Sequence, residues 1–312
     1  MFKSVYLGSW SHKIIGTSGP EPRIARDTLI SRASMAALTP RDLRSRMRLN
    51  RPPASAPPDS SHDSPPLLSI VIPVYNEADR VGSCLNTLVT WIAARDHSVE
   101  VLLVDDGSTD SSVPIARSIA TRYPCIRVLE ERHRGKANAV LAGLEAARGR
   151  YAGFCDVDLA TPLSTWDACE KEFEAGADVT IASREGLGAV RLGEPWYRHA
   201  MGRVFNALIR LLLLPGINDT QCGFKFFTQS ALKQILPHCR LYRGADVVTR
   251  PRVTAFDVEL LYIARRHELG IAVVPVTWTY GEHTKVNPLT DTFQNIGDVL
   301  KVRWNGWRGH YD

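Results

Sequence analysis

Past Pro66, short apolar runs alternate with helical patterns, and this alternation limits the folds that the chain can adopt. The run 67–74 (LLSIVIPV) has β-branched residues at its centre and is typical of a strand covered on both faces. Apolar residues at helical spacing follow over 81–92. Strands joined by helices of about ten to fifteen residues form right-handed βαβ units. We therefore predict an α/β fold with a mainly parallel central sheet flanked by helices. Further strands are expected at 99–104, 126–129, 151–154 and 177–182, and further helices at 111–123 and 136–147.

The second half of the chain is less regular. A glycine-rich segment covers 185–195, and an amphipathic helix is predicted at 197–214. A polar turn leads into an aromatic strand over 218–227. The pattern at 293–307 fits either a helix end in the core or a helix lying at a membrane interface. The remaining predictions are a helix at 256–267 and one strand at 271–278.

The charge of the chain is uneven. Residues 1–66 hold ten Lys or Arg against five Asp or Glu, and the remaining residues hold 28 against 28. With no basic field over the folded part, we predict no nucleic-acid partner. The leader 1–66 is rich in Pro, Ser and Arg and cannot bury enough apolar surface to offset the entropy of ordering, so we expect it to be disordered. A transit peptide or a basic tail on anionic lipid are the alternatives.

Cysteine usage and hydropathy indicate the redox compartment of the chain and whether it spans a membrane. Its six cysteines are scattered without a Cys-x-x-Cys pair, which favours free thiols in a reducing compartment. No apolar run reaches the roughly 18 residues that a spanning helix needs. We therefore expect a soluble or peripheral protein.

Paired carboxylates follow two of the predicted strands. Asp156 and Asp158 come directly after the strand at 151–154, and Asp105 and Asp106 end the strand at 99–104. Two carboxylates at the carboxyl edge of a sheet repel each other unless a cation lies between them, and Mg²⁺ or Mn²⁺ suits carboxylate and phosphate ligands. Such a cation would neutralise the diphosphate of a sugar nucleotide, and the earlier pair lies where open α/β sheets read a base or ribose. The alternatives are a solvated acidic loop and a capped turn.

Other candidates lie close by in the sequence. Tyr75 could stack on a base, and Asn76 or Glu77 could bond to ribose or base edges; the alternative is a plain turn from strand to helix. Lys136 opens a helix, where an anion would also find free backbone N–H groups, although it could be an ordinary surface lysine.

Several of these residues occur together in an order and spacing that resembles a known family. Pro73, Tyr75, Glu77, the run 105–110 (DDGSTD) and Asp156-x-Asp158 look like the nucleotide-binding half of family 2 glycosyltransferases, which have the GT-A fold. The runs 219–225 (DTQCGFK), 256–262 (FDVELLY) and 276–285 resemble dolichyl-phosphate β-glucosyltransferases within that family. The resemblance covers about 67–310. It implies a GT-A domain at 67–288, with a nucleotide-binding half at 67–184, an acceptor half at 185–288 and a C-terminal amphipathic helix at 289–312.

The resemblance implies inverting transfer of a hexose, glucose by analogy, from a nucleotide sugar such as UDP-glucose to a polyprenyl or dolichyl phosphate. Catalysis would rest on positioning and on stabilising the leaving diphosphate. Asp158 would act in catalysis, and Asp219 would orient the acceptor or act as a base, unless it is a turn residue. By the same analogy, the nucleoside and phosphate contacts would come from Pro73, Tyr75, Glu77, Asp105, Asp106, Lys136, Asp156, Arg184 and Lys285, with the metal on Asp156 and Asp158.

The chain also departs from the family pattern. The N-terminal membrane helix expected of the family is absent from this sequence, and the segment 242–254 looks longer than the family's link. We therefore expect a cytoplasmic protein, peripheral at the cytoplasmic face of a membrane. The alternatives are a soluble enzyme acting on a hydroxyl acceptor, mannosyl transfer from GDP-mannose, and a nucleotide-sugar sensor without turnover.

Overall fold

The computed structural model describes residues 65–243, 255–280 and 288–312, and within them a seven-stranded sheet carries the fold. The strand order is β3-β2-β1-β4-β7-β5-β8. Only β7 runs antiparallel to its neighbours, and every other pairing in this sheet is parallel. The strands are β1 (Leu68–Val74), β2 (Val99–Asp106), β3 (Ile126–Glu131), β4 (Tyr151–Cys155), β5 (Val179–Ser183), β7 (Phe224–Thr228) and β8 (Ile271–Pro275).

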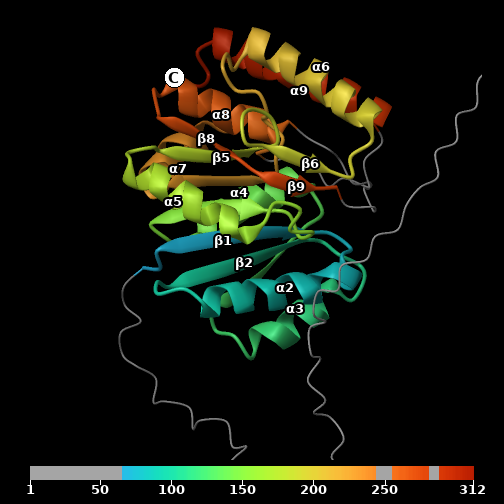
Figure 1. Cartoon of the computed structure of the whole chain (residues 1–312), viewed down its shortest axis with the longest axis vertical. Helices are drawn as coiled ribbons and strands as arrows, with labels where there is room; N and C mark the ends of the chain where they lie inside the picture. Colours follow the sequence, from blue (N-terminus) through green and yellow to red (C-terminus); the bar gives the residue numbers. More distant parts are fainter. Residues whose placement is uncertain (1–64, 244–254, 281–287) are drawn as a thin grey trace, which may run out of the picture. The chain divides into compact units, whose positions relative to one another are not determined.

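Helices cover both faces of this sheet (Figure 1). One face packs against α2 (Ala78–Ala93), α3 (Ser112–Ala120) and α5 (Trp166–Glu174). The other packs against α4 (Lys136–Ala146), α7 (Gln229–Ile235) and α8 (Phe256–Arg266). Two long helices, α6 (Trp196–Leu212) and α9 (Pro288–Trp307), pack against each other, and α9 also packs on α8. Figure 1 shows α6 and α9 side by side at the top of the view.

The alternation of strands and helices is confirmed, and the mainly parallel sheet with it. Three details differ from the prediction. The strand expected at 271–278 is two strands, because the chain leaves the main sheet after Pro275 and continues as β9 (Thr277–Thr279) in a second sheet. Its partner β6 (Val190–Leu192) lies within the glycine-rich segment. The helices α5, of nine residues, and α7, of seven, were not predicted.

Close packing fixes the position of α4 on the sheet. A methyl group added at Gly143 would lie 2.3 Å from Cγ1 of Val71, so the helix lies directly on β1. Val71 and Val140 are fully buried in this contact region. The amino end of α4, beginning at Lys136, is therefore held at the carboxyl edge of the sheet, where the acidic pairs lie.

None of the helices in the described part of the chain is long and apolar enough to span a bilayer. The leader predicted to be disordered falls almost wholly outside the residues that the structure describes.

Candidate functional site

The predicted site residues gather at one edge of the main sheet. The strands β1, β2, β4 and β5 all end at this edge, and the antiparallel β7 begins there. The order 3-2-1-4 reverses direction between β1 and β4, and ligands of open α/β sheets bind outside the carboxyl ends of strands at such a switch point. The topology thus brings together residues that lie far apart in the sequence.

Asp156 and Asp158 follow β4 and line one small cavity with Gly223 and Trp278. Asp158 accepts a hydrogen bond from the backbone N–H of Ala160 at 3.1 Å. Desolvation, and then the charge of Asp156, raise the pKa of the Asp158 carboxyl. The two carboxylates therefore sit close enough to repel, the condition that a shared cation relieves.

The donor set fits Mg²⁺ or Mn²⁺ completed by phosphate oxygens, since Mg²⁺ is commonly held by one or two carboxylates together with substrate phosphates. No group of three or more His, Cys, Asp or Glu side chains that could hold a metal occurs within the described ranges. The residues present therefore fit a cation that arrives with its phosphate ligands, and not one held by the protein alone.

Lys136 reaches one of these carboxylates, Asp156, from the first turn of α4. Its Nζ lies 2.5 Å from Oδ1 of Asp156, and both side chains are about two-fifths exposed. The helix can start here because Gly135 adopts a φ of +95°, a conformation that favours glycine. The ammonium thus lies where a divalent cation or a diphosphate would also lie.

Gly223 permits the approach of β7 to Asp156. A Cβ atom added at Gly223 would lie 2.2 Å from Oδ2 of Asp156 and 2.5 Å from its Cγ. Real Cβ atoms essentially never make contacts this short, so any residue other than glycine here would force the carboxylate of Asp156 to move. Gly223 belongs to the run 219–225 noted in the sequence, but its role there was not predicted.

The nucleoside end of the site contains a stacked aromatic pair. The rings of Tyr75 and His133 are parallel, with centroids 3.9 Å apart. His133 also contacts Asp106, with Nδ1 2.8 Å from Oδ2, and Asp106 accepts the backbone N–H groups of Arg134 and Gly135. A base could stack on Tyr75 only at the face opposite His133, or by displacing His133. No motif or periodicity in the sequence pointed to His133.

Asp105 is the carboxylate better suited to read a base. It is 3% exposed, and its Oδ2 accepts the backbone N–H of Ser108 at 3.0 Å. Its Oδ1 is buried and has no hydrogen-bond partner in the described part of the chain. A buried acceptor without a donor is costly, and a ring N–H of a bound base would satisfy it.

The turn after β1 is tied to the loop after β2. Asn76 has a φ of +51°, donates its backbone N–H to Ser108 Oγ and accepts the N–H of Thr109 on Oδ1, both at 2.8 Å. Glu77 donates its backbone N–H to Ser112 and pairs with Arg80 at 3.1 Å. Pro73 lies buried in β1 opposite Val104. These bonds hold the turn around Tyr75 in place. They do not test the predicted nucleoside contacts of Pro73 and Glu77, which stay predictions.

Arg184 and Asp219 form a buried pair after β5. Nε and Nη2 of Arg184 donate to the two oxygens of Asp219 at 2.8 and 2.9 Å, and the Arg184 backbone N–H adds a third bond. Asp219 is fully buried. Burial alone would raise the pKa of Asp219, but the guanidinium of Arg184 holds this pKa well below its usual range. A carboxylate held in this way is a poor proton acceptor, so this geometry argues against Asp219 as a base and makes it a positioning residue for Arg184.

Trp278 connects the two halves of the site. It lines the cavity of Asp156 and Asp158, and the guanidinium of Arg184 lies 5.2 Å from its ring centroid. The next residue of β9, Thr279, donates its N–H to the carbonyl of Ala160 in the acidic loop. Lys285, the remaining predicted phosphate ligand, lies outside the described residues.

Comparison with known proteins decides the family. Residues 69–236 match the family described as Glycosyl transferase family 2. The chain belongs to glycosyl transferase family 2. As a member of this family it is a glycosyltransferase, and its sheet with helices on both faces is the GT-A fold.

Curated family 2 relatives resemble most of the chain. A protein of Dictyostelium discoideum named dolichyl-phosphate beta-glucosyltransferase is 31% identical over 76% of this chain and 74% of its own length. The Drosophila melanogaster protein of the same name is 32% identical over 78% of this chain and 76% of its own length. The human protein of that name is 31% identical, with 76% and 74% covered.

Among solved structures, glucosyl-3-phosphoglycerate synthase of Mycobacterium tuberculosis, in complex with Mn²⁺, UDP-glucose and phosphoglyceric acid, superposes with a TM-score of 0.53. It is 19% identical, and the match covers 77% of this chain and 80% of that one. At this identity the likeness supports the fold of the family 2 enzyme and no more.

Proposed function

We propose that this glycosyltransferase transfers glucose from UDP-glucose to a dolichyl or other polyprenyl phosphate. The observation that supports it best is that Asp156 and Asp158 line one cavity at the switch point of the sheet, with Lys136 paired to Asp156. The names of the curated relatives, which are about 30% identical over three quarters of the chain, supply the sugar and the acceptor class.

A divalent cation on Asp156 and Asp158 would neutralise the donor diphosphate as the sugar leaves. The residues of the chain would do the rest. Asp105 would accept the ring N–H of uracil on its buried Oδ1, and Tyr75 would stack on the base. Lys136 would carry positive charge toward the phosphates at the amino end of α4, where the helix dipole also favours an anion.

The buried pairing of Asp219 with Arg184 supports a phosphate as the acceptor. A lipid phosphate is already ionised at neutral pH and needs no base, whereas a hydroxyl acceptor needs one. Asp219 was predicted to orient the acceptor or, for a hydroxyl acceptor, to act as the base, and its carboxylate is buried and bound by Arg184. We therefore favour a phosphate acceptor over the hydroxyl alternative.

A cavity of 430 Å³ beside Arg184 is our candidate for the acceptor entry. Arg191, His199 and the exposed Trp196 also line it. Arg191 pairs with Glu185 at 3.0 Å and with Glu194 at 2.6 Å, so its charge is already balanced. A phosphate would have to compete with these carboxylates for the cations that line the cavity. Lys285, which was predicted to contact phosphate, remains part of this proposal.

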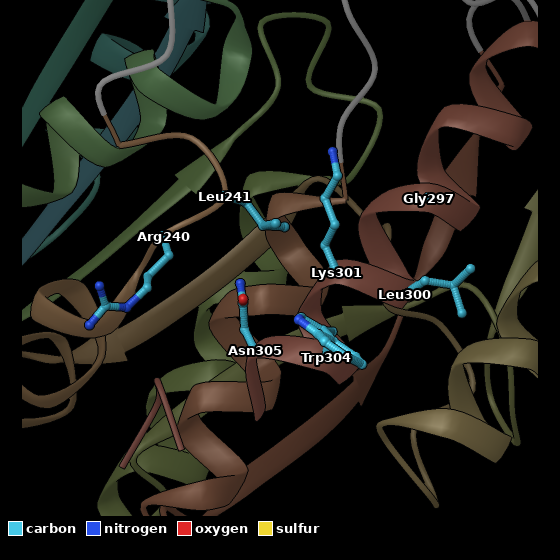
Figure 2. A pocket seen from close by; sticks show the side chains of 7 residues that line it. All are labelled: Arg240, Leu241, Gly297, Leu300, Lys301, Trp304 and Asn305. Carbon is cyan, nitrogen blue, oxygen red and sulfur yellow. The ribbon is translucent and has the colours of Figure 1, made fainter. Parts of the chain in front are cut away.

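Peripheral membrane contact, at the cytoplasmic face, would bring the enzyme to such an acceptor. Exposed apolar side chains project from α9, at Leu300, Trp304 and Trp307, and α6 adds Leu211, which is 81% exposed. Figure 2 shows Leu300, Lys301 and Trp304 beside a groove that Arg240 lines from the other side. Apolar side chains among cations suit an anionic lipid surface.

This contact is tested by sedimentation with vesicles of phosphatidylcholine, phosphatidylserine and dolichyl phosphate. We expect the protein to pellet with the vesicles at low salt and the double variant Trp304→Ser/Trp307→Ser to pellet several-fold less. Val273→Ser, at another exposed apolar residue on β8, is the matched control. Wild-type protein that stays in the supernatant would contradict the membrane contact.

The reaction itself is tested with labelled nucleotide sugars. Purified protein is incubated with Mn²⁺ and either UDP-glucose or GDP-mannose, with dolichyl phosphate or hydroxyl acceptors in detergent. We expect label in the organic phase from UDP-glucose and dolichyl phosphate. Label from GDP-mannose instead would correct the donor, and glucose found only on hydroxyl acceptors would refute the proposed acceptor.

A further inference from the structure

The surface of the proposed membrane contact contains a groove between α9 and the segment 240–241 (Figure 2). Its volume is 520 Å³, within the roughly 300–1,000 Å³ of small-molecule sites. Arg240 and Leu241 line one side. The other side is one face of α9, because its lining residues are mostly three or four positions apart. These residues are Gly297, Leu300, Lys301, Trp304 and Asn305.

Buried hydrogen bonds hold the two sides of the groove in place. Glu259 on α8 is 1% exposed, and its Oε1 accepts the backbone N–H groups of Arg240 and Leu241 at 2.9 and 3.0 Å. The same oxygen accepts the hydroxyl of Tyr311 at 2.8 Å. Tyr311 in turn accepts a hydrogen bond from Nδ2 of Asn305, on α9, at 3.2 Å. The groove is therefore formed before a ligand binds, which lowers the entropic cost of binding.

The cations at this groove are less neutralised than the arginines beside the candidate acceptor entry. Nε of Arg240 donates to a backbone carbonyl at 3.2 Å, and no carboxylate in the described ranges pairs with its guanidinium. The guanidinium of Arg308 lies 5.2 Å from the ring centroid of Trp304 and likewise has no ion-pair partner among the described residues. Lys301, mostly exposed, lies 3.5 Å from Asp298. Three cations thus share one carboxylate, and the groove suits an anion.

Apolar side chains beside these cations indicate which kind of anion fits. Leu300 and Trp304 line the same groove and are 54% and 52% exposed. A free phosphate would leave them in water, whereas a phospholipid would cover them with its glycerol and first acyl carbons. Tryptophan is also enriched at the headgroup level of bilayers. The combination of charge and apolar surface favours an anionic phospholipid.

We propose that this groove binds the headgroup of one anionic phospholipid, with Arg240 and Lys301 as the partners of its negative charge. The bound lipid fixes how α9 lies on the membrane. Transfer to an acceptor in the same bilayer therefore depends on anionic lipid. The inference rests on the peripheral membrane contact of the proposed function, and it assigns that contact a discrete site in place of a general attraction between charges.

The test uses dihexanoyl-phosphatidylserine below its critical micelle concentration, so that no membrane is present. Calorimetry with the full chain should show saturable binding of a single lipid molecule, at least about tenfold tighter than that of dihexanoyl-phosphatidylcholine or inorganic phosphate. Arg240→Gln should weaken binding about tenfold, because a charge-assisted hydrogen bond is lost. Arg303→Gln is the matched control, since it removes the same charge from an exposed position of α9 outside the groove, and it should change binding less than about twofold.

Equal losses from Arg240→Gln and Arg303→Gln would overturn the inference, because they would show a general attraction only. Phosphate or phosphatidylcholine binding as tightly as phosphatidylserine would overturn it too. If Arg240→Gln unfolds, Lys301→Gln takes its place, since this side chain is mostly exposed. Glucose transfer by the wild type is measured separately in detergent without anionic lipid. Transfer without phosphatidylserine binding would refute the lipid site alone, whereas lipid binding without transfer would refute the proposed function.

Discussion

Replacing Gly223 by alanine tests how closely the site depends on the position of Asp156. The added Cβ would lie 2.2 Å from Oδ2, whereas real Cβ atoms do not approach closer than 3.0 Å, so the carboxylate must move by at least the difference of 0.8 Å. A displacement of about 1 Å can cost a factor of about 100 in rate, which corresponds to about 2.7 kcal/mol of transition-state stabilisation. We expect kcat/KM for UDP-glucose to fall by that factor.

The assay is transfer of labelled glucose to dolichyl phosphate at varied UDP-glucose and Mn²⁺ concentrations. Thermal unfolding should change little, because the Asp156 side chain is partly exposed and can turn away. Gly270→Ala is the matched control, since its added Cβ would make only ordinary contacts of 3.7 Å or more at the opposite end of the sheet. Activity of Gly223→Ala within threefold of the wild type would refute the claim that this carboxylate must stay in place.

Three further substitutions separate structural from functional carboxylates. Asp219→Asn should lower the free energy of unfolding by about 3 kcal/mol at neutral pH, because it breaks a buried pair. Since the folded pKa of Asp219 is depressed, this difference should stay constant above the unfolded value of about 3.9 and shrink as pH falls below it, as measured by urea unfolding. Glu259→Gln should cost about 1–3 kcal/mol without lowering kcat, since Glu259 accepts the N–H groups of Arg240 and Leu241; a large loss of kcat in a folded variant would contradict this. Asp105→Asn should weaken UDP binding about tenfold in calorimetry and leave Mn²⁺ binding unchanged; unchanged UDP affinity would exclude its contact with the base.

Much of the nucleotide-binding half could be predicted because its signals are local. The strands β1, β2 and β4 are short apolar runs, and Asp106 and Asp156 stand at or just after their carboxyl ends. In parallel strands these ends meet at one edge, so sequence position alone places the carboxylates together.

The rest depends on contacts between distant segments. In the sequence, Gly223 is typical of a turn glycine. Its contact with the carboxylate of Asp156 arises only because β7 pairs antiparallel with β4. His133 and Trp278 reach the site from loops and strands whose course no periodicity predicts. Asp219 was predicted as a site residue, but its buried pairing with Arg184 is a tertiary contact that the sequence does not encode locally.

The proposed chemistry depends on a cation that joins Asp156 and Asp158 to the donor diphosphate, and calorimetry of UDP-glucose binding with Mn²⁺ or with EDTA measures its effect. We expect Mn²⁺ to tighten binding to the wild type at least tenfold, and we expect Asp158→Asn, still folded, to lose this metal dependence and its turnover. Equal affinity of the wild type for UDP-glucose with and without the metal would contradict this role of the cation.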